Sequence, residues 1–68
     1  MGNLALTAIT TDQGIHQIVI AEQGIKGYKV FSEGHTTYRT AQVEADRGNK
    51  ALGLDEYEAM RIIFSSMR

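Results

Sequence analysis

The chain has 68 residues and a formal net charge of −1, with seven lysines and arginines against eight aspartates and glutamates. A domain of this length removes only about 60% of its unfolded surface from water, so its core is small. The near-neutral charge is not that of a protein that binds phosphates or that imitates DNA. The sequence has no apolar run of about 18 residues, so it predicts no membrane span.

The composition also limits how the domain is stabilised. There is no cysteine, which excludes disulfides and cysteine-based zinc sites. Two histidines without clustered partners predict neither a structural metal nor a cofactor. Oligomerisation, or docking on a larger partner, is the remaining way to supplement a small core. The N-terminus lacks a basic segment followed by an apolar one, so we expect no signal peptide and a cytoplasmic protein.

Three segments of the first half have the residue types and alternation of β-strands. They are residues 4–10, 15–22 and 28–33. A turn at 11–14 and a glycine-bounded loop at 23–27 separate them. Because short loops join consecutive strands, the sequence predicts an antiparallel meander.

The second half predicts two helices, over residues 41–52 and 56–67. We take residues 36–39 as an extended lead-in, since Thr40 fits the N-cap position better than Thr37. Gly53 is predicted to end the first helix, with Asp55 capping the second.

The first predicted helix has a stripe of mostly small residues, formed by Ala41, Ala45, Gly48 and Leu52. We therefore expect it to approach the sheet closely. Because strands precede helices, the fold class is α+β, a three-stranded antiparallel meander followed by two short helices packed on one face. All of residues 1–68 are expected to form a single domain.

The residues that could support catalysis have simpler interpretations. His16 and His35 suit proton transfer near neutral pH, but no serine or cysteine motif accompanies them, so we interpret both as surface histidines. The carboxylates are accounted for by helix capping and by ion pairs along the helices. The loop at 24–27 precedes a strand, whereas a phosphate-binding loop precedes a helix. The sequence therefore predicts no enzyme.

The third strand and its flanks offer a mixture of polar and aromatic residues that suits a protein interface. The candidate partner-binding residues are Gln23, Lys26, Tyr28, Lys29, Glu33, Tyr38 and Arg39. Binding of single-stranded nucleic acid by the same sheet is an alternative, although alternation puts Tyr28 and Phe31 on opposite faces. The apolar surplus of strand 15–22 and helix 56–67 leaves a homodimer open as well.

The helical half resembles a pattern found in short bacteriophage and prophage proteins. In these, a strand meander precedes a helix that ends in an Asn-x-x-Leu-Gly-Leu turn. The matching residues in the segment 36–68 are Thr40-Ala41, Glu44-Ala45-Asp46, Asn49, Leu52-Gly53-Leu54, Ala59, Ile62 and Ser65-Ser66-Met67.

Small α+β phage proteins of this kind include the anti-CRISPR inhibitors. The resemblance implies a non-enzymatic protein that binds a host defence complex, such as a CRISPR effector, in the host cytoplasm. Since this chain is near neutral, the implied inhibition is steric and does not depend on imitating the charge of DNA. The resemblance assigns no individual binding residue.

Overall fold

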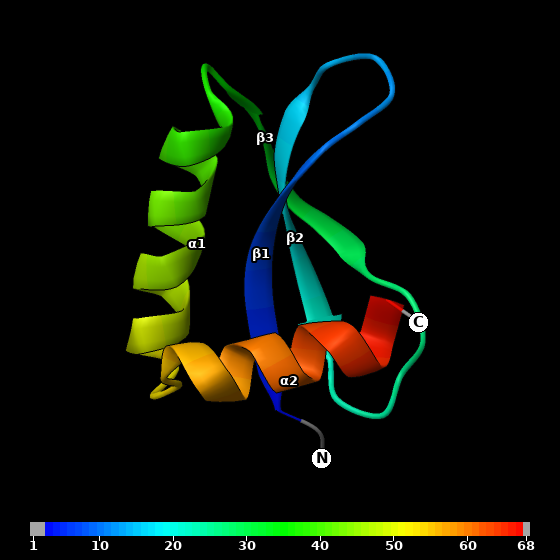
Figure 1. The fold of residues 1–68 in the computed structure, drawn as a ribbon, viewed down its shortest axis with the longest axis vertical. Helices are drawn as coiled ribbons and strands as arrows, with labels where there is room; N and C mark the ends of the chain where they lie inside the picture. The colour runs from blue at the N-terminus through cyan, green and yellow to red at the C-terminus, as the bar shows by residue number, and fades with distance from the viewer. Residues whose placement is uncertain (1–2, 68) are drawn as a thin grey trace.

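The computed structural model describes residues 3–67 of the chain (Figure 1). Its elements are the strands β1 (Leu4–Thr10), β2 (His16–Glu22) and β3 (Lys29–His35), then the helices α1 (Tyr38–Ala51) and α2 (Glu56–Met67). The strands form one antiparallel sheet in the order β1-β2-β3. This confirms the predicted α+β class, a strand meander followed by two helices.

The ends of two strands differ from the prediction. β2 begins one residue later than expected, at His16, and β3 runs from Lys29 to His35 instead of from 28 to 33. The strand continues past Glu33 because Gly34, with a φ of 85°, accommodates a shift in register, after which His35 pairs with His16. A residue with positive φ thus produces a bulge here, where the sequence pattern indicated a break.

Helix α1 begins earlier than predicted, and its N-cap is Thr37. The Thr37 Oγ1 accepts a hydrogen bond from the backbone N–H of Thr40 at 3.1 Å, and Thr37 itself is extended, with φ −139° and ψ 157°. The choice of Thr40 as the cap was therefore wrong. Tyr38 and Arg39 belong to the first turn of α1 and do not form an extended lead-in.

The two helices pack against different sides of β1, whereas the sequence analysis placed both on one face. Leu6 and Ala8 form a core cluster with α1, while Ala5 forms a second cluster with Ala59 and Ile62 of α2. Neighbouring residues of a strand point to opposite faces, so these clusters lie on opposite sides of the sheet. Figure 1 shows α1 alongside the sheet and α2 crossing in front of the lower end of β1.

Small side chains let α1 lie close to β1. Ala41 and Ala45 are fully buried, and a Cβ placed on Gly48 would overlap Leu6 Cδ1. The predicted stripe continued to Leu52, but that side chain is 50% exposed, and Asn49 is buried in its place. Leu52 lies at the C-cap, beyond the part of α1 that contacts the sheet.

The Asn49 side chain is joined to the backbone of β1. Its Nδ2 donates to the Leu6 carbonyl at 2.8 Å, and the Leu6 N–H donates to Asn49 Oδ1 at 2.6 Å. β1 is an edge strand, so these two groups of Leu6 have no neighbouring strand to pair with. The buried amide therefore pairs them in the way that another strand would.

The junction between the helices agrees with the prediction. Gly53 has a φ of 80°, and the Leu54 N–H donates to the Asn49 carbonyl at 3.0 Å, which closes the end of α1. Asp55 Oδ1 accepts a hydrogen bond from the Glu58 N–H at 2.8 Å and caps α2. This junction turns α2 away from α1 and across β1 (Figure 1).

Candidate protein-binding surface

The third strand and the loop before it carry four large apolar side chains that remain exposed. We call Ile25, Tyr28, Val30 and Phe31 the β3 patch; they are 55%, 49%, 52% and 61% exposed. α2 reaches the loop before β3, where the Gly27 N–H donates to the Ser66 carbonyl at 2.8 Å, but over residues 3–67 its backbone does not pack on β3 itself. α1 meets β3 at His35, beside Glu44. The patch is exposed because the helices pack on β1 and β2 and leave most of β3 uncovered.

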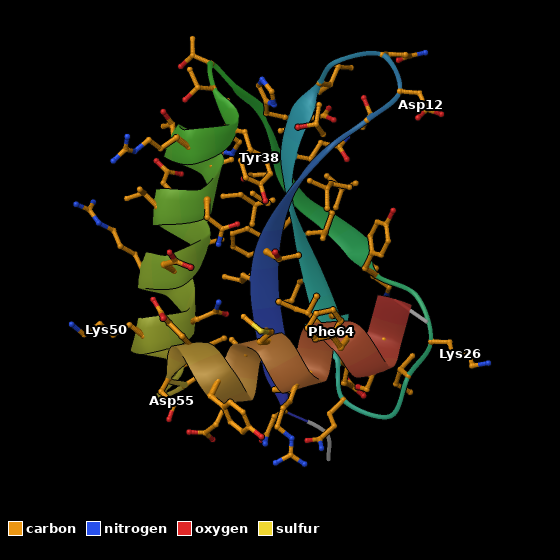
Figure 2. The ribbon with its side chains drawn as sticks, in the orientation of Figure 1. Asp12, Lys26, Tyr38, Lys50, Asp55 and Phe64 are labelled. Carbon is orange, nitrogen blue, oxygen red and sulfur yellow. The ribbon has the colours of Figure 1, made fainter. Side chains whose placement is uncertain are left out.

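A shallow hollow of about 440 Å³ lies at the start of β3. Three of the seven predicted partner-binding residues, Lys26, Tyr28 and Lys29, line it together with apolar Leu4 and Ile20. Figure 2 shows the Lys26 side chain directed outward from the loop between β2 and β3. The structure thus gathers these three residues around one mainly apolar depression, whose lining also includes Glu22.

The other four predicted residues do not line this hollow. Glu33 lies towards the far end of β3, where its Oε2 accepts a hydrogen bond from Gln17 Nε2 at 3.0 Å. Tyr38 and Arg39 lie at the start of α1. Gln23 follows β2 in the chain, and its backbone N–H donates to the Asn3 carbonyl at 2.8 Å.

Three members of the β3 patch were absent from the predicted set, namely Ile25, Val30 and Phe31. The available signal was the apolar character of both faces of the third strand, since Val30 and Phe31 are consecutive. The predicted set was chosen for polar and aromatic residues around this strand, so its aliphatic members and Phe31 were left out. The patch has the mixture of aromatic, aliphatic and lysine side chains found at the energetic centres and rims of protein interfaces.

The two register shifts between β2 and β3 affect how β3 can be contacted. They lie between His16 and Gln17 and between Ile18 and Val19. Bulges of this kind twist a strand and impair the addition of a further strand at its edge. A partner at the β3 patch is therefore expected to contact its side chains, without extending the sheet.

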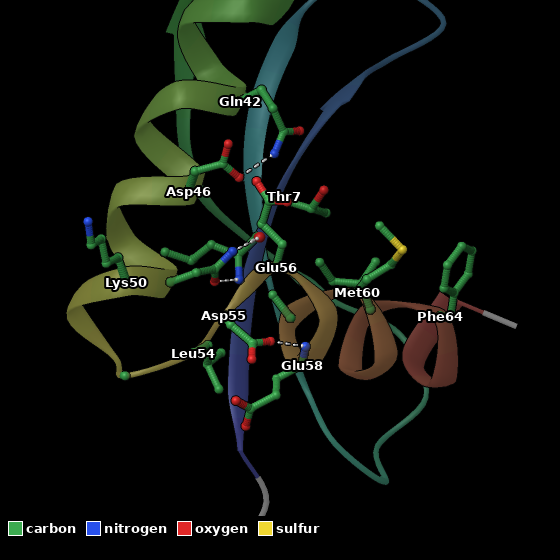
Figure 3. A pocket seen from close by; sticks show the side chains of 15 residues that line it. Thr7, Gln42, Asp46, Lys50, Leu54, Asp55, Glu56, Glu58, Met60 and Phe64 are labelled. Atoms are coloured by element: carbon green, nitrogen blue, oxygen red, sulfur yellow. Dashed lines mark hydrogen bonds between the residues drawn. The ribbon is translucent and has the colours of Figure 1, made fainter.

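A second and larger hollow of about 1050 Å³ lies between α1, α2 and the edge of β1 that faces away from β2 (Figure 3). We call it the α1–α2 groove. Its apolar lining consists of Leu6, Leu54, Ala59, Met60, Ile63 and Phe64. Its acidic lining consists of Asp46, Asp55, Glu56 and Glu58. The apolar surplus of residues 56–67 was expected from the sequence, whereas this groove was not.

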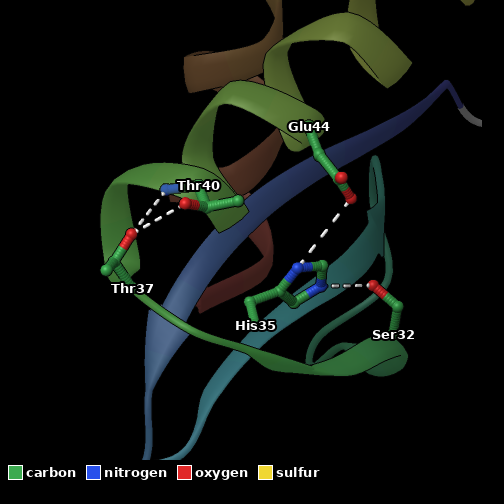
Figure 4. Close-up of polar contacts among 5 residues, drawn as sticks. All are labelled: Ser32, His35, Thr37, Thr40 and Glu44. Carbon is green, nitrogen blue, oxygen red and sulfur yellow. Dashed lines mark hydrogen bonds and ion pairs between the residues drawn. The ribbon is translucent and has the colours of Figure 1, made fainter.

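Both histidines are half-buried, which corrects their interpretation as surface residues. His35 Nε2 lies 2.8 Å from Ser32 Oγ, and His35 Nδ1 lies 3.8 Å from Glu44 Oε2 (Figure 4). The order serine, histidine, carboxylate is that of a catalytic triad, but 3.8 Å exceeds the length of a hydrogen bond. Ser32 and His35 line neither the hollow beside the β3 patch nor the α1–α2 groove. Their contacts connect the end of β3 to α1.

His16 forms a separate contact, with its Nδ1 3.0 Å from Thr10 Oγ1. Within the part of the chain that the structure describes, no three histidine, cysteine, aspartate or glutamate side chains are grouped to hold a metal ion. Over the same residues, neither helix combines the length and the hydropathy that crossing a bilayer requires. Comparison of the chain with protein-family models, with curated proteins and with solved structures gave no match.

Proposed function

We propose that this protein is a non-enzymatic protein-binding module that acts through the β3 patch. The observation that carries the proposal is the exposure of four large apolar side chains, contributed by one strand and the loop before it. Exposed large apolar side chains close together in a chain are typical of interaction sites in soluble proteins, and two of these four, Ile25 and Tyr28, line the same hollow. Tyr28 and Phe31 are the expected anchors, because aromatic side chains bury a large area for few rotatable bonds.

The charges around the patch indicate the character of the partner surface. Lys26, Lys29 and Tyr28 line the same hollow, with Glu22 as the one acidic residue in its lining. Such a lining favours a partner surface that combines apolar and acidic side chains. Charges at a rim mainly affect the rate of association and the specificity of binding.

The narrower form of the proposal is a phage-derived inhibitor that occupies a surface of a host defence complex, such as a CRISPR effector, in the host cytoplasm. It is supported by the resemblance of residues 36–68 to small phage proteins. The net charge of −1 favours a steric block over imitation of DNA. Inhibition by this route requires only that the bound domain occupies the place of a substrate or a subunit.

The first experiment is capture from bacterial lysate on the immobilised chain, with each retained protein then purified for affinity measurement. The variant Tyr28→Ser with Phe31→Ser removes the anchors, and Tyr57→Ser is the matched control, since Tyr57 is 70% exposed on α2. We expect the anchor variant to bind at least about tenfold more weakly, because hot-spot truncations cost about 2 kcal/mol or more. Equal binding by the anchor variant and the control would refute the role of the β3 patch.

A nuclease assay with purified CRISPR effector complexes tests the narrower form separately. We expect the wild-type chain to reduce target cleavage and the Tyr28→Ser, Phe31→Ser variant to lose that effect. Binding of another protein with unchanged cleavage would leave a binding module that does not inhibit CRISPR effectors. If the protein instead reduced the electrophoretic mobility of single-stranded DNA or RNA, and salt weakened this effect, the nucleic-acid alternative would be favoured.

A further inference from the structure

The α1–α2 groove keeps two large apolar side chains in contact with water. Met60 and Phe64 line it and are 54% and 64% exposed. They are four residues apart on α2, so they lie on the same flank of the helix. Figure 3 shows both side chains projecting from the same side of α2. The core clusters of the domain include neither of them, so they are available as anchors for a ligand.

The charged residues of the groove are predominantly acidic. Asp46 comes from α1, while Asp55, Glu56 and Glu58 come from the start of α2, and Lys50 is the one basic residue in the lining. Figure 3 shows Lys50 directed away from Met60 and Phe64. These carboxylates give the groove a negative potential that attracts cationic side chains.

Two of these carboxylates also have roles within the fold. Asp46 Oδ1 accepts a hydrogen bond from Gln42 Nε2 at 2.9 Å, and Asp55 Oδ1 caps α2 through the Glu58 N–H at 2.8 Å. A carboxylate has two oxygens and about four acceptor positions, so each retains capacity for another donor. Their structural roles therefore leave the charge of the groove in place.

The edge of β1 limits the form of a ligand. Asn49 already occupies both the N–H and the carbonyl of Leu6. An extended peptide that added to β1 would have to displace this buried amide. A ligand in the groove is consequently bound through side chains, which is the way that an amphipathic helix binds in an apolar groove.

We propose that the α1–α2 groove binds an amphipathic helix of a partner protein. The helix would place apolar side chains against Met60 and Phe64, with lysine or arginine beside them facing Asp46 and Glu56. This site is separate from the β3 patch, since it shares no lining residue with it. The protein would thus have two binding surfaces of different chemistry.

The probe is a synthetic peptide of about 14 residues, or four helical turns. It has leucines at helical spacing, lysines elsewhere and a single tryptophan. Because the chain contains no tryptophan, peptide fluorescence reports binding directly. Two control peptides replace lysine by glutamate or rearrange the same residues into strict alternation. We expect both controls to bind at least about tenfold more weakly, and added salt to weaken binding of the lysine peptide.

Variants of the chain locate the site. We expect Met60→Ser with Phe64→Ser, and separately Asp46→Asn with Glu56→Gln, to weaken peptide binding by about tenfold or more. The matched controls Tyr57→Ser and Glu44→Gln lie on the same helices but outside the groove, and should bind as the wild type does. Circular dichroism confirms that each variant is folded.

Three results would overturn the proposal: no binding of the lysine peptide, equal binding of the glutamate peptide, or full affinity in the Met60 and Phe64 variant. The Tyr28→Ser, Phe31→Ser variant should bind the peptide normally. The proposal for the α1–α2 groove can therefore be refuted independently of the proposal for the β3 patch.

Discussion

At the scale of single residues, Asn49 joins α1 to the backbone of β1 by two hydrogen bonds. It is 5% exposed, and its amide pairs with both backbone groups of Leu6. We did not predict this role, because an asparagine in a helix is ordinarily interpreted as exposed. Its spacing from Ala41 and Ala45, however, places it on the same stripe four residues further on. A polar residue that continues an apolar stripe indicates a buried hydrogen bond.

Replacement of Asn49 by alanine should lower the free energy of unfolding by about 2–4 kcal/mol, because two backbone groups lose their partner where an edge strand offers no other. Urea unfolding followed by circular dichroism measures the change. Gln42→Ala on the same helix is the control and should change stability by less than about 0.5 kcal/mol. A loss for Asn49→Ala as small as that of the control would show that water replaces the amide without cost.

At the scale of the elements, the sequence predicted what depends on local chemistry. β1 and α2 have their expected bounds, because alternation identifies the strand and Asp55 identifies the start of the helix. The bulge at Gly34 could not be predicted in this way, since it depends on pairing with β2. The side of the sheet on which α2 packs could not be predicted either, because β1 presents apolar residues to both faces and no local signal selects one.

The start of α1 gives a direct comparison of two threonines. Thr37→Ala should reduce the free energy of unfolding by about 1 kcal/mol, because the Thr40 N–H loses its acceptor. Thr40→Ala should cost less than about 0.5 kcal/mol, since among the described residues its exposed hydroxyl forms a hydrogen bond only with Thr37 Oγ1. Thermal unfolding of both variants decides between the caps, and the reverse order of effects would restore Thr40 as the N-cap.

The turn between the helices depends on the conformation of Gly53. Gly53→Ala should destabilise the protein by about 1–2 kcal/mol, because a Cβ is unfavourable at a φ of 80° even though no atom lies within 4 Å of its position. Gly53→Asn should cost less, since asparagine tolerates the left-handed region better. Denaturant midpoints for the pair measure the strain, and equal midpoints would indicate that the turn rearranges.

At the scale of the whole molecule, the two helices cover β1 and β2 and leave most of β3 and one flank of α2 exposed. The sequence predicted that Lys26, Tyr28 and Lys29 belong to one surface, because they are near neighbours in the chain. It could not predict the exposure of Val30 and Phe31, which depends on where the helices pack. The α1–α2 groove could not be predicted either. Its lining combines residues of β1 with residues of α1 and α2 that are far from β1 in the chain.

Apolar residues in the core and apolar residues left exposed should contribute differently to the stability of the whole molecule. Phe31→Ser and Phe64→Ser should each change the free energy of unfolding by less than about 1 kcal/mol, because these side chains are 61% and 64% exposed. Ile62→Ala, at a position that is 4% exposed, should cost about 2–5 kcal/mol. Urea unfolding of the three variants measures this contrast.

As a control, the unfolding of each variant is repeated at several protein concentrations. This tests for a homodimer that buries one of the exposed phenylalanines. A dimer makes the unfolding midpoint depend on protein concentration. If Phe31→Ser or Phe64→Ser alone destabilises the protein and removes that dependence, the corresponding surface is an interface between two copies. If both variants keep the wild-type midpoint at every concentration, the two phenylalanines are not needed for folding and remain free to bind other proteins.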